Sequence, residues 1–430
     1  MSHRSENGIH SDIFFDVQPR WSKITTSSGA SLPAPTVFTG RPLRGTLVIS
    51  HDKRQEEVFD VVQLTLQGEV QSIIRLSSGS YCKIKKPLIL MSSVKVANEF
   101  EQIDAEDPHT VTYQTEFFFD IPDFTTLPSS HGNNTPKRLP PSMRVVKSNF
   151  ISAATAEIHN SGSIAGTCDV TYKIAACVFA GGRLKSDASR EIILMPIEDK
   201  PPPLEPEDFG KEYRLVGATS LRPSWGLRKS LMVVVSSMEP RPLTFSNREE
   251  GCESTEVLLH LKTEGLSDGS SERAFVESHL TDCEVQINLE AVTYFSAEEQ
   301  KAVMSMAEAL RSPSVVLKKT KYATNRKKLR LERWMKGREI APGIFEWETT
   351  VSVTTILPTS FSRLPSFFTS LVARRYAFDV QITFGHWSGI NVFHKPIKLR
   401  IPLQIVHFTA GKFLGHSLED DDLDAPVYVS

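Results

Sequence analysis

Apolar and polar side chains alternate along many short segments of this chain, and this alternation limits its possible folds more than any other feature. The clearest case is residues 62–70, where Val62, Leu64, Leu66 and Val70 fall on one face of an extended chain. Glutamine, threonine and glutamate fall on the other face. A two-residue period is typical of an antiparallel strand with one face on a core and the other in water. The segment is therefore predicted to be such a strand.

Segments of the same kind recur throughout the 430 residues, with turn residues between them. Further strands are predicted at 13–17, 43–50, 73–76, 88–91, 94–96, 115–121, 168–178, 191–196, 229–235, 256–261, 284–294, 345–356, 376–384 and 396–406. One segment has helical character instead. A capping box of Ser296 and Glu299 precedes Val303, Met306 and Leu310, which predicts a short helix over 297–311.

A proline-rich stretch divides the chain near its middle. Residues 199–208 hold four prolines among charged residues, and proline fixes φ and removes a backbone donor, so we expect a stiff spacer outside any sheet. Many short strands with little helix favour β-sandwiches over a parallel α/β sheet. The predicted fold class is all-β, with two immunoglobulin-like β-sandwich domains in tandem at 12–198 and 209–410. The linker 199–208 joins them, and an acidic tail over 411–430 is expected to be disordered.

The composition narrows the functional classes. Apolar residues make up 40% and charged residues 23%, and the longest apolar runs are far too short to span a bilayer. The first residues have no apolar core behind a basic region, so we expect a cytoplasmic protein. The five cysteines are scattered and expected to be reduced. The net charge of −2 argues against a globally basic nucleic-acid binder, and no nucleic-acid partner is expected.

Motifs of enzymatic chemistry are missing from the sequence. It has no nucleophile elbow, phosphate-binding loop or zinc-protease motif. His386, His394 and His407 form the densest histidine group, but each lies in or beside a predicted strand and is expected to be a surface or core residue. We therefore predict no catalytic residue, no cofactor and no metal site.

The strongest charge feature is a basic segment in the second half. Its predicted anion or membrane contacts are Lys318, Lys319, Lys321, Arg326, Lys327 and Lys328. Basic residues near an anionic surface contribute about 1 kcal/mol each to binding. The alternative is that the segment is a solvated loop in a long insertion.

The tail combines an acidic run with a proline and a tyrosine. Residues 425–428 read Ala425-Pro426-Val427-Tyr428, which is close to the P-P-x-Y pattern that WW domains bind. Ala425 stands where the pattern has its first proline. Ala425, Pro426 and Tyr428 are therefore predicted to form a degenerate WW-binding motif, and the alternative is an acidic end with no such role.

Several segments together resemble a known family. Residues 38–47, 64–69, 139–142 and 170–174 are similar, in their order as well, to the arrestin N-terminal domain of fungal arrestin-related (alpha-arrestin-like) proteins. Residues 364–376 and 396–406 are similar to the end of the companion C-terminal domain. The resemblance covers about residues 12–410.

The resemblance implies an arrestin-like fold and a non-enzymatic adaptor or scaffold. Such an adaptor recognises the cytoplasmic tails of membrane transporters or receptors and brings them a HECT-type ubiquitin ligase for endocytosis, peripherally at the plasma membrane or endosomes. The sequence departs from the pattern because it has no intact P-P-x-Y. The alternative is therefore a vacuolar-sorting or retromer-like coat subunit that recruits no ligase.

Overall fold

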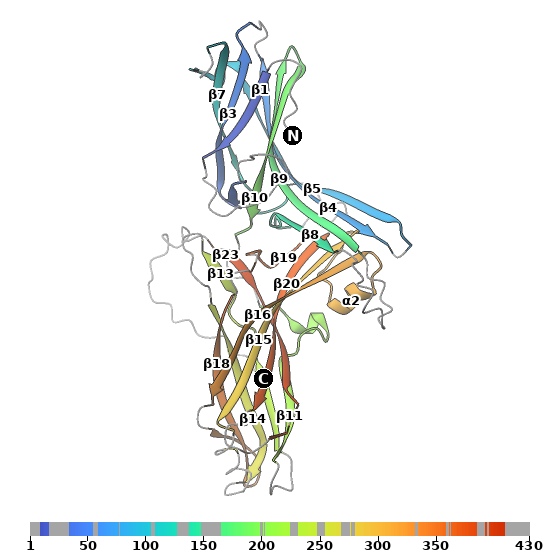
Figure 1. Ribbon diagram of the computed structural model, residues 1–430. Helices are drawn as coiled ribbons and strands as arrows, with labels where there is room; N and C mark the ends of the chain where they lie inside the picture. Colours follow the sequence, from blue (N-terminus) through green and yellow to red (C-terminus); the bar gives the residue numbers. More distant parts are fainter. Residues whose placement is uncertain are drawn as a thin grey trace.

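The structure is a computed structural model of the chain, and the residues that it describes lie mostly in β-strands. It describes residues 9–16, 34–54, 59–76, 78–104, 108–126, 137–147, 165–197, 201, 203–223, 231–246, 254–267, 276, 280–331, 334–357, 361, 363–384, 392–393 and 395–408. Within these ranges the strands group into two pairs of packed sheets, which we call the first and second sandwich and which lie end to end (Figure 1). The predicted all-β class is confirmed at this level.

Two sheets form the first sandwich, with strand orders β1-β3-β7-β6 and β2-β10-β9-β4-β5, and β8 pairs with β9. The strands are β1 (Ile9–Phe15), β2 (Thr36–Phe38), β3 (Pro42–Asp52), β4 (Val61–Arg75), β5 (Tyr81–Val96), β6 (Glu101–Ile103), β7 (Thr110–Asp120), β8 (Met143–Lys147), β9 (Ala165–Ala180) and β10 (Arg183–Met195), with the 3-10 turn η1 (Ala97–Glu99) after β5. Val62, Leu64, Leu66 and Val70 are buried in the core between the sheets, as their alternation predicts.

The second sandwich packs a sheet of order β17-β18-β14-β12-β11-β21 against one of order β16-β15-β20-β19, in which β22 also pairs with β20. The elements are η2 (Pro206–Phe209), β11 (Val216–Pro223), β12 (Leu231–Ser237), β13 (Leu243–Ser246), β14 (Ser254–Ser267), β15 (Asp282–Ser296), α2 (Met306–Arg311), β16 (Val315–Arg330), β17 (Met335–Ala341), β18 (Ile344–Ile356), β19 (Phe367–Phe368), β20 (Val372–Phe384), β21 (Val392–Phe393), β22 (Ile397–Leu403) and β23 (Ile405–Phe408). β13 and β23 form a separate parallel pair.

The helix predicted over 297–311 is present, but its predicted first residue is wrong. Helix α2 covers only Met306–Arg311, and its capping box is made by Ser305 and Glu308. The box at Ser296 cannot form because the backbone N–H of Ser296 already donates to the carbonyl of Leu371, at 2.8 Å. The carboxylate of Glu299, which would have bonded that N–H, instead pairs with Lys86 at 2.8 Å.

The basic segment is not an insertion loop. Residues 315–330 form strand β16, which is antiparallel to β15 along its length, and residues 335–341 form β17. The apolar side chains Leu317, Tyr322 and Leu329 interrupt the charges at positions where the strand contacts its neighbours. The reading of this segment as a solvated loop is therefore a wrong prediction.

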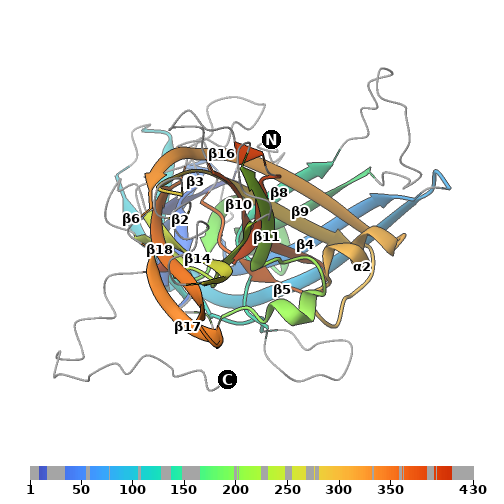
Figure 2. The same cartoon turned by 90° about the horizontal axis from the view of Figure 1, so that it is seen from below.

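The two sandwiches meet through apolar side chains. Phe295 of β15, Val316 of β16 and Val372 of β20 belong to the core of the first sandwich rather than the second. A methyl group on Gly166 of β9 would lie 2.9 Å from the ring of Phe295, so glycine is needed for this close approach. Strands β4, β5 and β9 extend beyond the first sandwich on the same side as α2 (Figure 2).

Candidate functional site

The outer face of the sheet that contains β15, β16, β20 and β22 carries a network of charged side chains. Register sets Glu290 of β15 opposite Lys321 of β16, and Asp379 of β20 opposite Arg400 of β22. Directly opposed residues in antiparallel strands project to the same face. The inner face carries the core residues Ile287 and Leu289. The outer face is therefore a surface where acids and bases from four strands meet.

Strand β16 places the six predicted basic residues on two faces. Lys319, Lys321, Arg326 and Lys328 lie on the outer face, opposite Val292, Glu290, Gln286 and Glu284, and we call these four the basic row. Lys318 and Lys327 lie on the inner side of the strand, and the ammonium of Lys327 donates to the carbonyl of Thr354 on β18, at 2.6 Å. The structure thus brings four of the six residues together and separates two.

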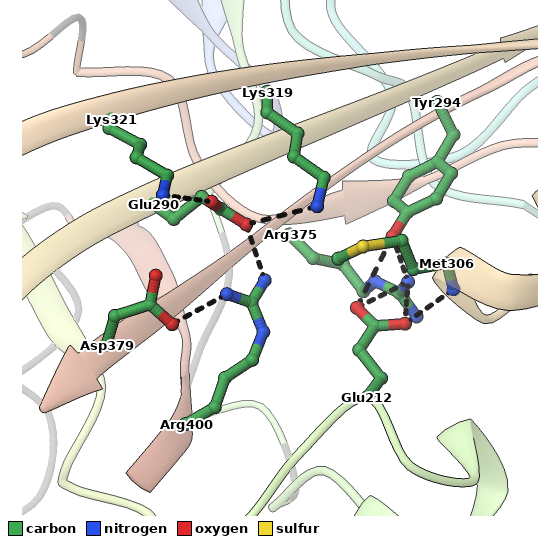
Figure 3. A network of polar contacts seen from close by, with 9 residues as sticks. All are labelled: Glu212, Glu290, Tyr294, Met306, Lys319, Lys321, Arg375, Asp379 and Arg400. Atoms are coloured by element: carbon green, nitrogen blue, oxygen red, sulfur yellow. Dashed lines mark hydrogen bonds and ion pairs between the residues drawn. The ribbon is translucent and has the colours of Figure 1, made fainter. Parts of the chain in front are cut away.

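Glu290 is the acidic centre beside the basic row (Figure 3). One of its carboxylate oxygens lies 2.7 Å from Nη2 of Arg400, and Lys319 and Lys321 lie 4.0 and 3.8 Å away. Its side chain is only 3% exposed. Nη1 of Arg400 pairs with Asp379 at 2.8 Å. Burial lowers the pKa of Arg400, but the carboxylates of Asp379 and Glu290 outweigh that effect, so its pKa lies above the ordinary value.

The exposed part of the basic row is less neutralised. Arg326 bonds and pairs with Glu284 while its own side chain remains 71% exposed, and the Lys321 side chain is 70% exposed. Exposed ion pairs of this kind contribute little to stability because water screens them. Their charges therefore remain accessible to an external anion.

A second group of charges on the same face is buried. The segment 203–214, which we call the strap, begins within the proline-rich stretch and includes η2. Nη2 of Arg375 on β20 donates to both carboxylate oxygens of the strap residue Glu212, each at 3.0 Å. The backbone N–H of Met306 at the start of α2 also donates to Glu212, at 2.7 Å. Glu212 therefore joins the strap to β20 and α2 (Figure 3).

Aromatic rings enclose the Arg375 guanidinium. Its central carbon lies 4.4 Å from the ring centre of Phe209 and 4.7 Å from that of Tyr294. The Arg375 and Glu212 side chains are 7% and 3% exposed. Burial raises the pKa of Tyr294 well above its ordinary value, and the hydroxyl therefore stays protonated and donates to Glu212 at 3.3 Å.

Apolar and backbone contacts hold the rest of the strap. Phe209 and Tyr213 pack with Ala377 of β20 in a small cluster of their own, which Leu204 and Val303 border. Arg214 and Arg400 exchange two backbone hydrogen bonds, each at 2.9 Å. The described residues of the proline-rich stretch lie outside the sheets, as expected, but from residue 203 onward they belong to the strap and are fixed to the second sandwich.

Sequence reasoning missed Glu212, Glu290, Arg375, Asp379 and Arg400. A signal was present for some of them, because Glu290 and Arg375 stand inside runs that otherwise have apolar character. Charged residues are almost never fully buried unless paired, so a charge in such a run indicates a buried ion pair. The partners are not predictable from this signal, since Glu212 and Arg375 are separated by 163 positions.

The other predicted sites fall in different places. Ala425, Pro426 and Tyr428 lie outside the described residues, as do His386 and His394. His407 is buried where the sandwiches meet: it forms a bridge with Ile197, and its Nε2 lies 2.6 Å from the carbonyl oxygen of Arg363. Within the described ranges, no three histidine, cysteine or acidic side chains are grouped as a metal site requires.

No protein-family model matches the chain, and a comparison with curated proteins finds no match. The link to arrestin-related proteins therefore rests on the residues quoted for the resemblance and is carried forward as a proposal. In the part of the chain that the structure describes, no helix is both long enough and apolar enough to cross a membrane.

Proposed function

We propose that the protein is a non-enzymatic adaptor of the arrestin-related kind, with arrestin-like domains at 12–198 and 209–410. It links the cytoplasmic tails of membrane transporters or receptors to ubiquitin-dependent endocytosis, from a cytoplasmic position at the plasma membrane or endosomes. The resemblance of the quoted segments supports this function. The two sandwiches and their shared apolar contact are compatible with it, because a scaffold needs a fixed relation between its binding surfaces.

The observation that carries the membrane part of the proposal is the basic row. Its charges stand on one face of one strand, and Lys321 and Arg326 are largely exposed. An adaptor for membrane proteins works beside an anionic leaflet, where each nearby lysine or arginine contributes about 1 kcal/mol. The basic row therefore serves as the peripheral contact with anionic lipid headgroups in this proposal.

Vesicle binding tests this role. We expect the double variant Lys321→Gln, Lys328→Gln to bind phosphatidylserine-containing vesicles about tenfold more weakly than the parent, with the difference shrinking as salt is added. The matched control is Lys83→Gln, Lys85→Gln, which removes the same charge from exposed positions on β5. Equal losses in both variants would show that only net charge matters, and unchanged binding of the first variant would exclude the basic row as the contact.

The ligase part of the proposal depends on the motif Ala425-Pro426-Val427-Tyr428. Isolated tail peptides are expected to bind WW domains of HECT-type ligases weakly, because one of the two prolines that fill the groove is missing. Ala425→Pro should tighten binding, and Tyr428→Ala should abolish it. Calorimetry with the three peptides decides, since each tenfold change corresponds to about 1.4 kcal/mol.

The second candidate function is a vacuolar-sorting or retromer-like coat subunit without ligase recruitment. The observation that favours it is Ala425 in the place of the first proline. If Tyr428→Ala binds as well as the native peptide, the ligase role fails and the coat role replaces it. The vesicle experiment bears on both candidates, because a coat subunit also works at a membrane.

A further inference from the structure

The basic row carries more positive charge than the acids opposite it neutralise. The register of β16 with β15 sets two acids, Glu284 and Glu290, opposite its four bases. Glu290 is held mainly by Arg400, whose Nη2 lies 2.7 Å from it. The side chains of Lys321 and Arg326 are 70% and 71% exposed. This surface is therefore suited to an anionic partner.

The sequence after the second sandwich contains an anionic segment of matching length, residues 419–424, which we call the acidic run. Five of its six residues are acidic: Glu419, Asp420, Asp421, Asp422 and Asp424. Fully extended, the run measures about 17 Å from its first residue to its last. Lys321 and Arg326 lie about 17 Å apart along β16 at the usual rise of a strand. The acidic run can therefore contact the two most exposed bases at once.

Residues 409–418 are long enough to bring the acidic run to the basic row. One row of paired residues crosses the sheet from β22 to β16 through Leu403, Tyr376, Ala291 and Thr320. The three strand spacings add up to about 14 Å. Phe408 at the end of β23 is five residues beyond Leu403, at most about 18 Å away, and so at most about 32 Å from Thr320. The eleven residue steps from Phe408 to Glu419 extend to about 38 Å, which exceeds this separation.

We propose that the acidic run binds the basic row of the same chain. Each exposed ion pair is weak, but the tether keeps the run close to its site, so several pairs act together. The contact itself does not depend on the function proposed above. It has one consequence that rests on that function: the acidic run competes with anionic lipid headgroups for the basic row.

Lysine acetylation of the full chain tests the contact. With limiting acetic anhydride, we expect Lys321 to react more slowly than Lys83, an exposed lysine of β5, and peptide mass spectrometry gives both rates. The tail variant removes three charges from the acidic run: Asp420→Asn, Asp421→Asn and Asp422→Asn. It should make Lys321 react about threefold faster and leave Lys83 unchanged. Added salt should accelerate Lys321 in the parent as well, because it screens exposed ion pairs.

The matched control removes the same charge from exposed positions of the first sandwich. It carries Glu101→Gln, Glu116→Gln and Asp120→Asn. In this control, Lys321 should react as slowly as in the parent. The proposal is overturned if the tail variant leaves the Lys321 rate unchanged, or if the control raises it equally. It is also overturned if the protection of Lys321 is lost on dilution, because the acidic run then binds a second copy of the chain.

Vesicle binding separates this proposal from the proposed function. Where both hold, the tail variant should bind phosphatidylserine-containing vesicles about threefold more tightly than the control variant, because the basic row is no longer occupied. Protection of Lys321 with equal vesicle binding by both variants would support the contact and exclude the lipid role of the basic row. Tighter vesicle binding without protection of Lys321 would overturn the contact and leave the lipid role in place.

Discussion

The outer face of the β15–β16–β20 sheet has two charged regions that use the same residue types differently. At the strap, Glu212 and Arg375 are nearly inaccessible to water, and the Arg375 guanidinium lies between two aromatic rings. On the basic row, Lys321 and Arg326 are largely exposed, although each lies within ion-pair distance of an acid. The charges are alike, but water screens only the second group. The buried pair of Glu212 and Arg375 is therefore expected to affect the stability of the fold, and the basic row is expected to affect the binding of external anions.

Glu290 lies between the two regions and has contacts with both kinds of charge, a buried arginine and exposed lysines. It is buried and pairs closely with Arg400, while the lysines of the basic row reach it only at 3.8 and 4.0 Å. Its charge is therefore neutralised mainly from the buried side. The positive charges of Lys319 and Lys321 therefore remain largely available to attract an external anion.

The largest expected effect comes from breaking the buried pair. Arg375→Met leaves the Glu212 carboxylate buried without a cation, and such losses cost roughly 3–5 kcal/mol of stability. Urea denaturation should show this decrease in the free energy of unfolding. Vesicle binding by the folded fraction should not change, because Arg375 is not part of the basic row.

A double variant distinguishes the charge from the packing. In Glu212→Gln, Arg375→Met no charge is left unpaired, so we expect stability to recover by more than about 1 kcal/mol relative to Arg375→Met alone, the size of coupling seen between contacting residues. If the double variant is no more stable than the single one, the stacking of Arg375 on Phe209 and Tyr294 is the main contribution, and the buried charges matter less.

Sequence reasoning succeeded where the cause is local. The alternation at residues 62–70 predicts the buried face of β4 correctly, because side-chain period and burial are linked within one strand. It failed where a residue far away in the sequence determines the local structure. The helix start at Ser296 is lost to the carbonyl of Leu371, and the two faces of β16 depend on a register shift in its pairing with β15 at Ile287 and Asn288. Charge density in β16 also concealed its apolar positions.

His407 is a buried basic group beside which the described residues place no acid, in contrast to Arg375 at the strap, and it therefore offers a separate test. Burial lowers its pKa below the ordinary 6.5; the hydrogen bond with the Arg363 carbonyl raises it, and the positive charge of Arg363 lowers it again. The unfolded chain therefore binds this proton at higher pH than the folded chain. Stability should be fully present above about pH 6.5 and decrease as the pH falls below it, by up to about 1.4 kcal/mol per pH unit.

Replacing His407 by Gln removes the titrating group and should flatten this part of the pH–stability curve. The measurement is the urea midpoint between neutral pH and mildly acidic pH for both chains. His10 is the matched control, because it is exposed and lies beside Asp12. If His10→Gln flattens the curve as much as His407→Gln, the buried histidine is not the source of the pH dependence.

The smallest expected effect on stability comes from the exposed row. Arg326 contacts Glu284 in an exposed position that water screens, so Arg326→Gln should leave the free energy of unfolding nearly unchanged, while binding to anionic vesicles decreases. The informative comparison is with Arg375→Met. We expect Arg375→Met to lower stability without affecting vesicle binding, and Arg326→Gln to weaken vesicle binding without affecting stability. If Arg326→Gln destabilises the chain as strongly as Arg375→Met, exposure does not separate the two regions, and the basic row is structural rather than a contact surface.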